Sequence, residues 1–259
     1  MGKSEASRLR RTHPSIPSLA GRGSRCHSPL MTLEDLILFI DGEAIVIDKP
    51  AGLPVDHPRA GGDSIEARIG ELTCGFARPP VAMHRLDRDT SGCLLFARNY
   101  KSRARYQQAF ETGLVSKSYI AVVDGETPGE EGVIDLPVAK RSSAARGWRM
   151  VVEDGGKQAV TRWRRIGAID GQSLVEFLPS TGRTHQIRVH AARGLGAAIV
   201  GDPVYCRADD DDEPGDMVLP DSGLLLHAWR IGLPREPKEP IDVTAPVPER
   251  FGRWLDLLP

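Results

Sequence analysis

Short apolar runs recur along the chain between clusters of turn residues, a pattern that predicts strands more often than helices. The predicted strands are Ala44–Asp48, Cys93–Ala97, Tyr119–Asp124, Ala159–Ile166, Leu174–Leu178, Leu224–Ala228 and Ile241–Thr244. The predicted helices are Ile65–Leu72, a segment capped by Asn99 that ends near Thr112, Thr184–Arg193 and Glu249–Leu257. Strands outnumber helices and do not alternate with them strictly. We therefore expect an α+β fold with a mixed, mostly antiparallel sheet.

Residues 1–30 differ in composition from the rest of the chain. They are rich in Arg, Ser, Pro and Gly, contain one acidic residue, Glu5, and lack the apolar segment of a secretory signal. A disordered basic tail, or a start assigned too early, accounts for them better than a targeting peptide does, and a more ordinary sequence begins at Met31. The expected organisation is a tail over residues 1–30 and one domain over residues 31–259.

The charge of the chain is small overall but unevenly distributed. Of the 259 residues 40% are hydrophobic, which is enough for a sizeable core, and no run of about 18 apolar residues could span a membrane. A net charge of −1 would by itself disfavour nucleic acid as a partner. However, His84–Arg105 holds six basic and two acidic residues, and Arg141–Arg165 holds seven and two. Trp148 and Trp163 lie in the second segment, which suits either a polyanion with stackable bases or solvated strands with core tryptophans.

The cysteines indicate a reduced protein. Cys26, Cys74, Cys93 and Cys206 form no CxxC pair, so the spacing of a zinc ribbon is absent. A chain of this length does not need disulfides to stabilise its core. We expect free thiols and a cytoplasmic protein.

The first segment with candidate chemistry is Met83–Gly92, which runs directly into the apolar strand Cys93–Ala97. A polar loop held by a buried strand is a common place for catalytic groups. Asp87 has arginines on both sides in the sequence, and a carboxylate beside guanidinium groups stays ionised, as a nucleophile or base must. A surface ion-pair loop is the alternative. Structural hydrogen bonds are the expected role of four nearby or related polar side chains, His84, Thr90, Ser91 and His227.

The second segment is Pro179–His190, which reads PSTGRTHQIRVH. His185 and His190 are five residues apart, so they do not match the i, i+4 pair of a helical zinc site. The polar side chains here are expected to form hydrogen bonds, either to core groups or to an anionic ligand. The acidic run Asp209–Glu213 is expected to be a solvated loop.

Six blocks of the chain, in order, resemble the RluA-type pseudouridine synthases. HRLDRDTSG (His84–Gly92) and RTHQIRVH (Arg183–His190) are similar to the two signature blocks of that family. The other four similar blocks are Asp48–Gly52, Lys117–Ala121, Gly201–Tyr205 and Leu226–Ala228. Six blocks in the family's order are far more specific than any single motif.

The resemblance implies an isomerase that converts uridine in RNA to pseudouridine without a metal or an organic cofactor. It implies that Asp87 is the catalytic carboxylate, which either attacks C1′ or removes a proton from C2′. Tyr119 would stack on the target base and assist removal of the C5 proton, and Arg183 would pair with Asp87. Arg85 would enter the RNA stack where the base leaves it. The other expected RNA contacts are Arg88, His84, Arg188 and Lys117.

The fold implied by the resemblance is a bent, mostly antiparallel sheet with flanking helices around a central basic cleft. Too few residues lie between Met31 and Ala44 for the S4 domain of larger members, so we expect a compact, monomeric member that acts on structured ribosomal or transfer RNA. The alternatives are an RNA-binding module without catalysis and a hydrolase or lyase that uses Asp87 on another nucleoside.

Overall fold

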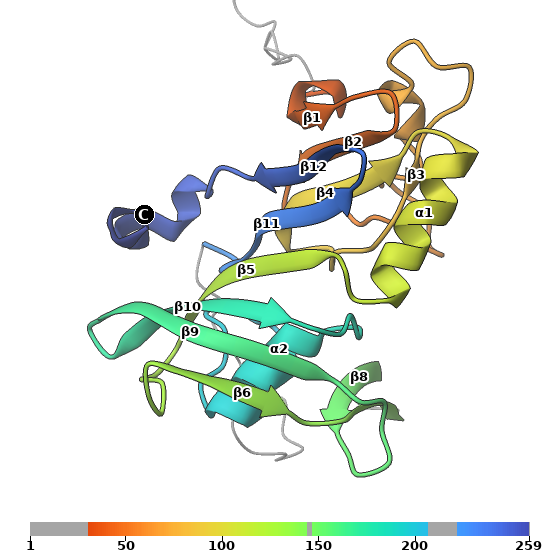
Figure 1. Ribbon diagram of the computed structural model, residues 1–259. Helices are drawn as coiled ribbons and strands as arrows, with labels where there is room; N and C mark the ends of the chain where they lie inside the picture. Colours follow the sequence, from red (N-terminus) through yellow and green to blue (C-terminus); the bar gives the residue numbers. More distant parts are fainter. Residues whose placement is uncertain (1–30, 144–146, 207–221, 259) are drawn as a thin grey trace, which may run out of the picture. The chain divides into compact units, whose positions relative to one another are not determined.

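A ten-stranded mixed sheet dominates the computed structural model, which describes residues 31–143, 147–206 and 222–258 (Figure 1). Its strand order is β1-β2-β4-β11-β5-β10-β9-β6, with β12 paired to β11 and β3 to β4. The pairs are antiparallel except β4 with β11. The fold is therefore α+β, as predicted. The expectations for residues 1–30 and for Asp209–Glu213 lie outside the described residues.

The strands are β1 (Ile37–Ile40), β2 (Ala44–Lys49), β3 (Val81–Ala82), β4 (Ser91–Ala97), β5 (Ser116–Val123), β6 (Glu131–Asp135), β7 (Val138–Ser143), β8 (Gly147–Val152), β9 (Val160–Ile169), β10 (Gln172–Pro179), β11 (Leu226–Arg235) and β12 (Lys238–Thr244). The α-helices are α1 (Tyr100–Glu111) and α2 (Gln186–His190). Shorter helical segments are η1 (Glu34–Leu36), η2 (Ile69–Leu72), the π-helical η3 (Ala191–Leu195) and η4 (Glu249–Leu257).

Alternation along β5 gives the sheet two buried faces. Ile120 and Val122 pack on the face covered by η4, in the same cluster as Trp254. Ala121 packs on the opposite face, in the cluster that contains Ile187 of α2. A sheet buried on both faces holds its strands rigidly, so groups at the strand ends have fixed positions.

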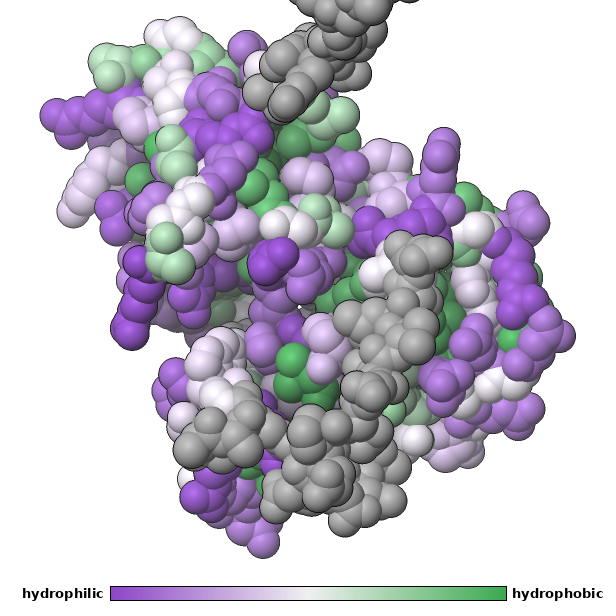
Figure 2. Space-filling view, turned by 180° about the vertical axis from the view of Figure 1, so that it is seen from behind, coloured by the Kyte–Doolittle hydropathy of each residue, from purple (hydrophilic) through white to green (hydrophobic). Residues whose placement is uncertain are grey.

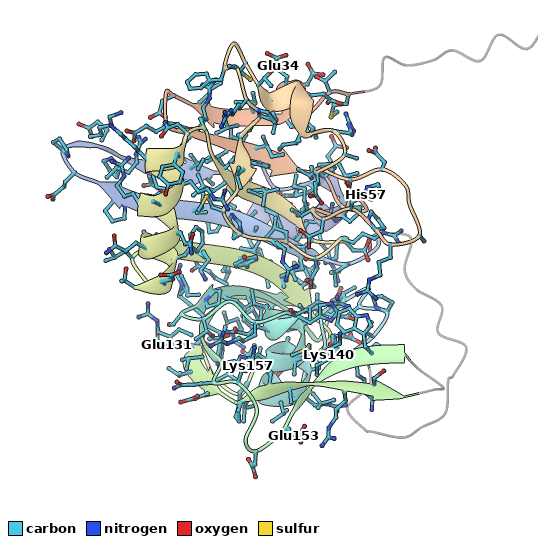
Figure 3. All side chains as sticks on the ribbon, turned by 90° about the vertical axis from the view of Figure 1, so that its right-hand side faces the viewer. Glu34, His57, Glu131, Lys140, Glu153 and Lys157 are labelled. Atoms are coloured by element: carbon cyan, nitrogen blue, oxygen red, sulfur yellow. The ribbon has the colours of Figure 1, made fainter. Side chains whose placement is uncertain are left out.

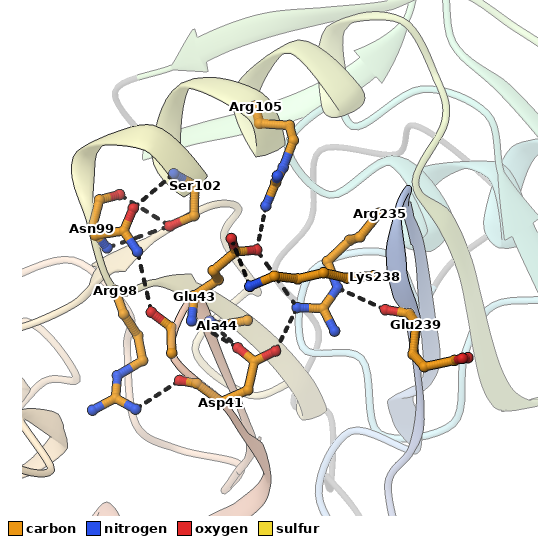
Figure 4. Close-up of polar contacts among 11 residues, drawn as sticks. Asp41, Glu43, Ala44, Arg98, Asn99, Ser102, Arg105, Arg235, Lys238 and Glu239 are labelled. Carbon is orange, nitrogen blue, oxygen red and sulfur yellow. Dashed lines mark hydrogen bonds and ion pairs between the residues drawn. The ribbon is translucent and has the colours of Figure 1, made fainter.

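Helix α1 begins where the sequence predicted it. The Asn99 side chain accepts a hydrogen bond from the Ser102 amide (2.9 Å), and the Ser102 hydroxyl in turn accepts from the Asn99 amide. Beside this cap, Asp41 accepts hydrogen bonds from the β1–β2 turn and from Arg235 at 2.6 Å (Figure 4). The Arg98 guanidinium donates to the Asp41 carbonyl (2.7 Å). These contacts connect the edge of the sheet to the β11–β12 hairpin.

Three predicted helices are shorter or different. Ile65–Leu72 contains only the 3₁₀ segment η2, because the amides of Ile69, Glu71 and Thr73 donate to carbonyls three rather than four residues back. Thr184–Arg193 reduces to α2 and η3, because the backbone of His185 is left-handed (φ 53°). Glu249–Leu257 is 3₁₀ and is broken at Gly252, whose φ and ψ are not helical. In each case local hydrogen bonds or backbone geometry override the helical periodicity.

The β7–β8 hairpin was not predicted. It forms a separate two-stranded sheet with Lys140 opposite Met150. Figure 3 shows Lys140 and Lys157 at this end of the domain. Its strands pack Val138 and Met150 into a hydrophobic cluster and carry the exposed Trp148.

The outward surface is largely polar. Hydrophilic residues predominate over the face in Figure 2, with smaller hydrophobic areas between them. Among the described residues no helix is long and apolar enough to cross a membrane. In the same part of the chain Cys74, Cys93 and Cys206 are free thiols, as predicted; the cytoplasmic location remains a prediction.

Candidate active site

Asp87 lies in the loop that leads into β4. Its carbonyl accepts a hydrogen bond from the Thr90 amide (3.1 Å), which closes a tight turn. The next carbonyl, of Arg88, accepts from the Gly52 amide (2.9 Å). The Asp87 side chain keeps 25% of its surface exposed, so the carboxylate is held in place and is still accessible.

A buried lysine supports this loop. Lys49, at the end of β2, is fully buried and donates to the carbonyls of Pro50, Leu53 and Arg88 at 2.7 to 3.0 Å. Three acceptors match the three N–H groups of an ammonium. Burial lowers the pKa of Lys49 to about 7, and the nearby carboxylates, chiefly Asp89, act in the opposite direction. Lys49 thus joins the loop after β2 to the Asp87 loop.

The other end of the Asp87 loop is tied to β11 and to η4. The buried Ser91 hydroxyl lies 2.8 Å from His227 Nδ1 and accepts a hydrogen bond from Arg250 (2.6 Å). Gly92 has φ 109°, and a Cβ there would lie 2.2 Å from the Ala228 carbonyl oxygen, so only glycine fits. The predicted structural hydrogen bonds of Ser91 and His227 are therefore confirmed.

Arg188, on α2, holds the Asp87 carboxylate. Its guanidinium donates to Asp202 through Nε and Nη2, both at 2.7 Å, and Nη1 lies 3.4 Å from Asp87 Oδ2. Burial alone would lower the pKa of Arg188. The hydrogen bonds and charge of Asp202, together with the charge of Asp87, outweigh this effect and raise the pKa above that of an ordinary arginine. The Asp202 side chain has no exposed surface. Arg188 is therefore a charged bridge between two carboxylates.

The predicted pair of Arg183 with Asp87 is wrong. Arg183 is exposed, and its Nε donates to the Gln158 carbonyl (3.0 Å). It precedes α2 in a turn, whereas Arg188 lies on the buried side of that helix. The predicted RNA contact of Arg188 is wrong as well, because its guanidinium is engaged by two carboxylates inside the protein. The other expectation for this segment, hydrogen bonding to core groups, describes Arg188 correctly.

His185 also borders Asp87. Its Nε2 lies 3.9 Å from Asp87 Oδ2, and its Nδ1 lies 2.9 Å from the Tyr205 hydroxyl. The Trp148 ring packs against it with the centroids 5.1 Å apart. The left-handed backbone of a histidine is uncommon and is often found at functional sites.

Tyr119, on β5, completes the group around Asp87. Burial, and then the charge of Asp87, raise the pKa of the Tyr119 hydroxyl, which therefore stays protonated at neutral pH. The partly buried Tyr119 side chain packs against two hydrophobic clusters. One of these clusters contains Leu86, the residue before Asp87, so β5 and the Asp87 loop, distant in sequence, meet at this site.

The remaining predicted RNA contacts differ in accessibility. Arg85 is 68% exposed and pairs with Asp56 at 2.7 Å, and Arg88 is exposed near the Gly52 carbonyl. Lys117 Nζ lies 3.4 Å from the Thr181 carbonyl oxygen, and burial lowers its pKa. Their contacts with RNA remain predictions.

His84 has a structural role. Its Nε2 accepts a hydrogen bond from the Leu95 amide of β4 (3.1 Å), and its ring packs near Phe110. The prediction of a structural hydrogen bond is confirmed, and the RNA contact remains a prediction. Burial, with a smaller effect of Lys117, lowers the pKa of His84 to about 3.

This pKa predicts how stability depends on pH. The pKa of His84 falls from 6.5 in the unfolded chain to about 3, so its stabilising contribution is complete above pH 6.5 and is lost as pH falls toward 3. In His84→Gln, whose side chain can still accept from Leu95, the free energy of unfolding should vary less with pH over that range. Urea unfolding at a series of pH values measures this. The matched variant of the exposed His57, His57→Gln, should follow the wild type; an equal pH dependence in His84→Gln would contradict the prediction.

Several site residues were not singled out from the sequence. Lys49, Asp202 and Tyr205 lie in the family-like blocks, but their roles come from contacts between segments far apart in the chain. Arg250 lies outside these blocks, and no sequence pattern marks it as a site residue. Within the described ranges no three His, Cys, Asp or Glu side chains gather as metal ligands.

Comparison with known proteins identifies the family. Residues 43–193 match the sequence family described as RNA pseudouridylate synthase. The chain is 50% identical over 215 residues to an uncharacterized RNA pseudouridine synthase of Zymomonas mobilis, covering 83% of this chain and 94% of the relative. It is 37% identical to a ribosomal large subunit pseudouridine synthase D of the same organism, covering 86% and 72%.

Solved structures give the same result. Human RNA pseudouridylate synthase domain containing 4 superposes with a TM-score of 0.71 at 27% identity, covering 87% of this chain and 93% of that one. Human RNA pseudouridylate synthase domain containing 1 gives a TM-score of 0.61 at 25% identity, covering 81% and 82%. The fold, the group of residues around Asp87 and these similarities show that the chain belongs to the RluA-type RNA pseudouridine synthase family.

Proposed function

We propose that this enzyme modifies specific uridines of structured ribosomal or transfer RNA and that Asp87 is its catalytic carboxylate. The observation that carries the proposal is the bridge from Asp202 through Arg188 to an accessible Asp87. The guanidinium is fixed bidentately on Asp202 and presents Nη1 to Asp87, which a lysine could not do at the same time. A relative named as a ribosomal large subunit enzyme supports ribosomal RNA as one substrate.

In the proposed reaction the N1–C1′ bond breaks and the base turns. A C5–C1′ bond then forms as Asp87 leaves C1′ or returns the C2′ proton, and the proton that C5 gives up to solvent is balanced by the one that N1 takes up. Asp87 either attacks C1′ or takes a proton from C2′, and both routes need an ionised carboxylate held near the ribose. Tyr119 stacks on the freed base and keeps it in the site while it turns. Its hydroxyl is protonated in the free enzyme, which favours a platform over a proton acceptor.

The target base must leave the RNA stack before Asp87 can reach its ribose. Arg85 is exposed beside the Asp87 loop, and we propose that it fills the gap in the stack. The β7–β8 hairpin offers a second contact surface. There Trp148 is 48% exposed, and Lys140 Nζ lies 4.9 Å from the centre of its ring.

Trp148→Ala should weaken RNA binding by roughly tenfold, because stacking of a base on an aromatic ring contributes about 1–3 kcal/mol. The free energy of unfolding should change little, because the ring is half exposed. Fluorescence anisotropy with a labelled RNA stem-loop measures the affinity. Tyr100→Ala, which removes an exposed aromatic ring on α1, is the matched control. Equal affinities of Trp148→Ala and the wild type would exclude this contact.

The experiment that tests the function is pseudouridine mapping of total RNA with and without the gene. The proposal predicts that one or a few uridines in ribosomal or transfer RNA lose the modification and regain it when the purified enzyme is added. Identical maps, and no pseudouridine formed in vitro, would refute it.

A further inference from the structure

The hydrogen bonds of the Tyr205 hydroxyl fix the proton on the His185 ring. The Tyr205 oxygen accepts a hydrogen bond from the Met150 amide (3.0 Å), and it lies 2.9 Å from His185 Nδ1. Burial raises the pKa of Tyr205 to about 12, so the hydroxyl keeps its proton. Among the described residues His185 Nδ1 is the acceptor within hydrogen-bond distance of this O–H, so the hydroxyl stays satisfied by donating its proton to Nδ1. The neutral ring then carries its own proton on Nε2.

The same ring is held in a single orientation. Trp148 packs on one side of it, and Tyr205 approaches edge-on with the centroids 5.7 Å apart. Burial, with the charge of Arg188, lowers the pKa of His185, although Asp87 opposes this, so the ring is neutral at physiological pH. The protein also maintains a left-handed backbone at this residue, a conformation that residues other than glycine rarely adopt.

The Nε2–H group therefore points toward Asp87 without bonding to it. The separation of 3.9 Å from Oδ2 exceeds the length of a hydrogen bond. The His185 side chain is 14% exposed, so a substrate can reach the ring. An N–H donor and a carboxylate acceptor thus face one small space. A hydroxyl group fits that pair, because it accepts one hydrogen bond and donates another.

We propose that His185 is a substrate-contacting residue whose Nε2–H donates to the 2′-hydroxyl of the target nucleotide, while that hydroxyl donates to Asp87. This rests on the proposed role of Asp87 at C1′ or C2′, since the 2′-hydroxyl is the donor–acceptor group next to both atoms. The ring oxygen O4′ can only accept. The 2′-hydroxyl also distinguishes RNA from DNA, so His185 would make the target position specific for ribose.

The first test measures the proton on the ring and needs no RNA. In ¹⁵N-histidine-labelled protein, the nitrogen shifts of His185 should be those of the Nε2–H tautomer, and the spectrum of His185→Gln identifies the signal among the seven histidines. In Tyr205→Phe the two tautomers should mix. A wild-type ring protonated on Nδ1 would overturn the proposal.

The second test measures recognition of the 2′-hydroxyl. The probes are two synthetic stem-loops that carry the uridine mapped for the wild-type enzyme, one with uridine and one with 2′-deoxyuridine at that position. Binding is measured in the Asp87→Asn background, so that no turnover occurs. His185→Gln and His185→Leu are the matched pair: both bear the same left-handed backbone and lose the aromatic contacts, but only glutamine keeps an N–H donor.

Loss of the 2′-hydroxyl should weaken binding roughly tenfold more with His185 or with Gln at this position than with Leu, the size of the one hydrogen bond that Leu cannot donate. Equal discrimination by the Leu and Gln variants would overturn the proposal. If the wild type forms no pseudouridine at all, the proposed function fails instead, and the tautomer measurement still decides the state of the ring.

Discussion

Asp87→Asn should reduce pseudouridine formation roughly 10⁴-fold or more, the usual cost of removing a nucleophile or base that acts as part of a unit. Asparagine has nearly the same shape as aspartate and can still accept a hydrogen bond from Arg188. It can neither attack C1′ nor take a proton. RNA affinity should therefore stay near the wild-type value, and single-turnover rates on the mapped stem-loop measure the loss.

Asp89→Asn is the matched control for this variant. Asp89 lies in the same loop, but its side chain is 44% exposed beside Arg88, and it makes no contact with Arg188 among the described residues. Its rate should stay within a few-fold of the wild type. Turnover by Asp87→Asn near the wild-type rate, or an equal loss in Asp89→Asn, would remove Asp87 from the catalytic role. The first outcome would also leave no basis for the His185 proposal.

Arg188→Lys should lower the rate by roughly 100-fold, because lysine cannot hold Asp202 bidentately and contact Asp87 at the same time. It should also lower the free energy of unfolding by about 2 kcal/mol, since charged hydrogen bonds to a buried carboxylate are lost. Rates measured well below the melting temperature, with RNA affinity measured in parallel, separate the two effects. The affinity should change little, because Arg188 does not face the RNA.

Arg183→Lys is the control for Arg188→Lys. The two arginines lie five residues apart in one block, but Arg183 is exposed, and its side chain donates to the Gln158 carbonyl rather than to a carboxylate. Arg183→Lys should keep the wild-type rate within a few-fold. The reverse result, a large loss at Arg183 and little at Arg188, would mean that the Asp202–Arg188–Asp87 bridge does not position the carboxylate.

The net charge of −1 illustrates how far composition can mislead about a partner. Much of the positive charge is held in internal pairs, such as Arg235 with Asp41 and Arg188 with Asp202. Arg85, by contrast, lies at the surface beside the site. RNA binding depends on the local field at the site rather than on the total.

Local sequence was sufficient wherever neighbouring residues determine the geometry. The Asn99 cap, most core strands and the position of Asp87 in a loop before β4 were predictable, because capping groups and period-two patterns act over a few residues. The six blocks also identified the family, and membership of that family implies the fold and the reaction. The sequence alone therefore determined what kind of enzyme this is.

Only the tertiary structure decided which side chains act on Asp87. Arg183 and Arg188 are equivalent as letters in a motif, but the fold leaves Arg183 at the surface and buries Arg188 beside Asp87. The bridge to Asp202 and the proton on His185 depend on segments that meet only after the sheet has formed. Hydrogen bonds and ion pairs act over a few ångströms in space, whatever the separation in the chain, so no local pattern could predict them.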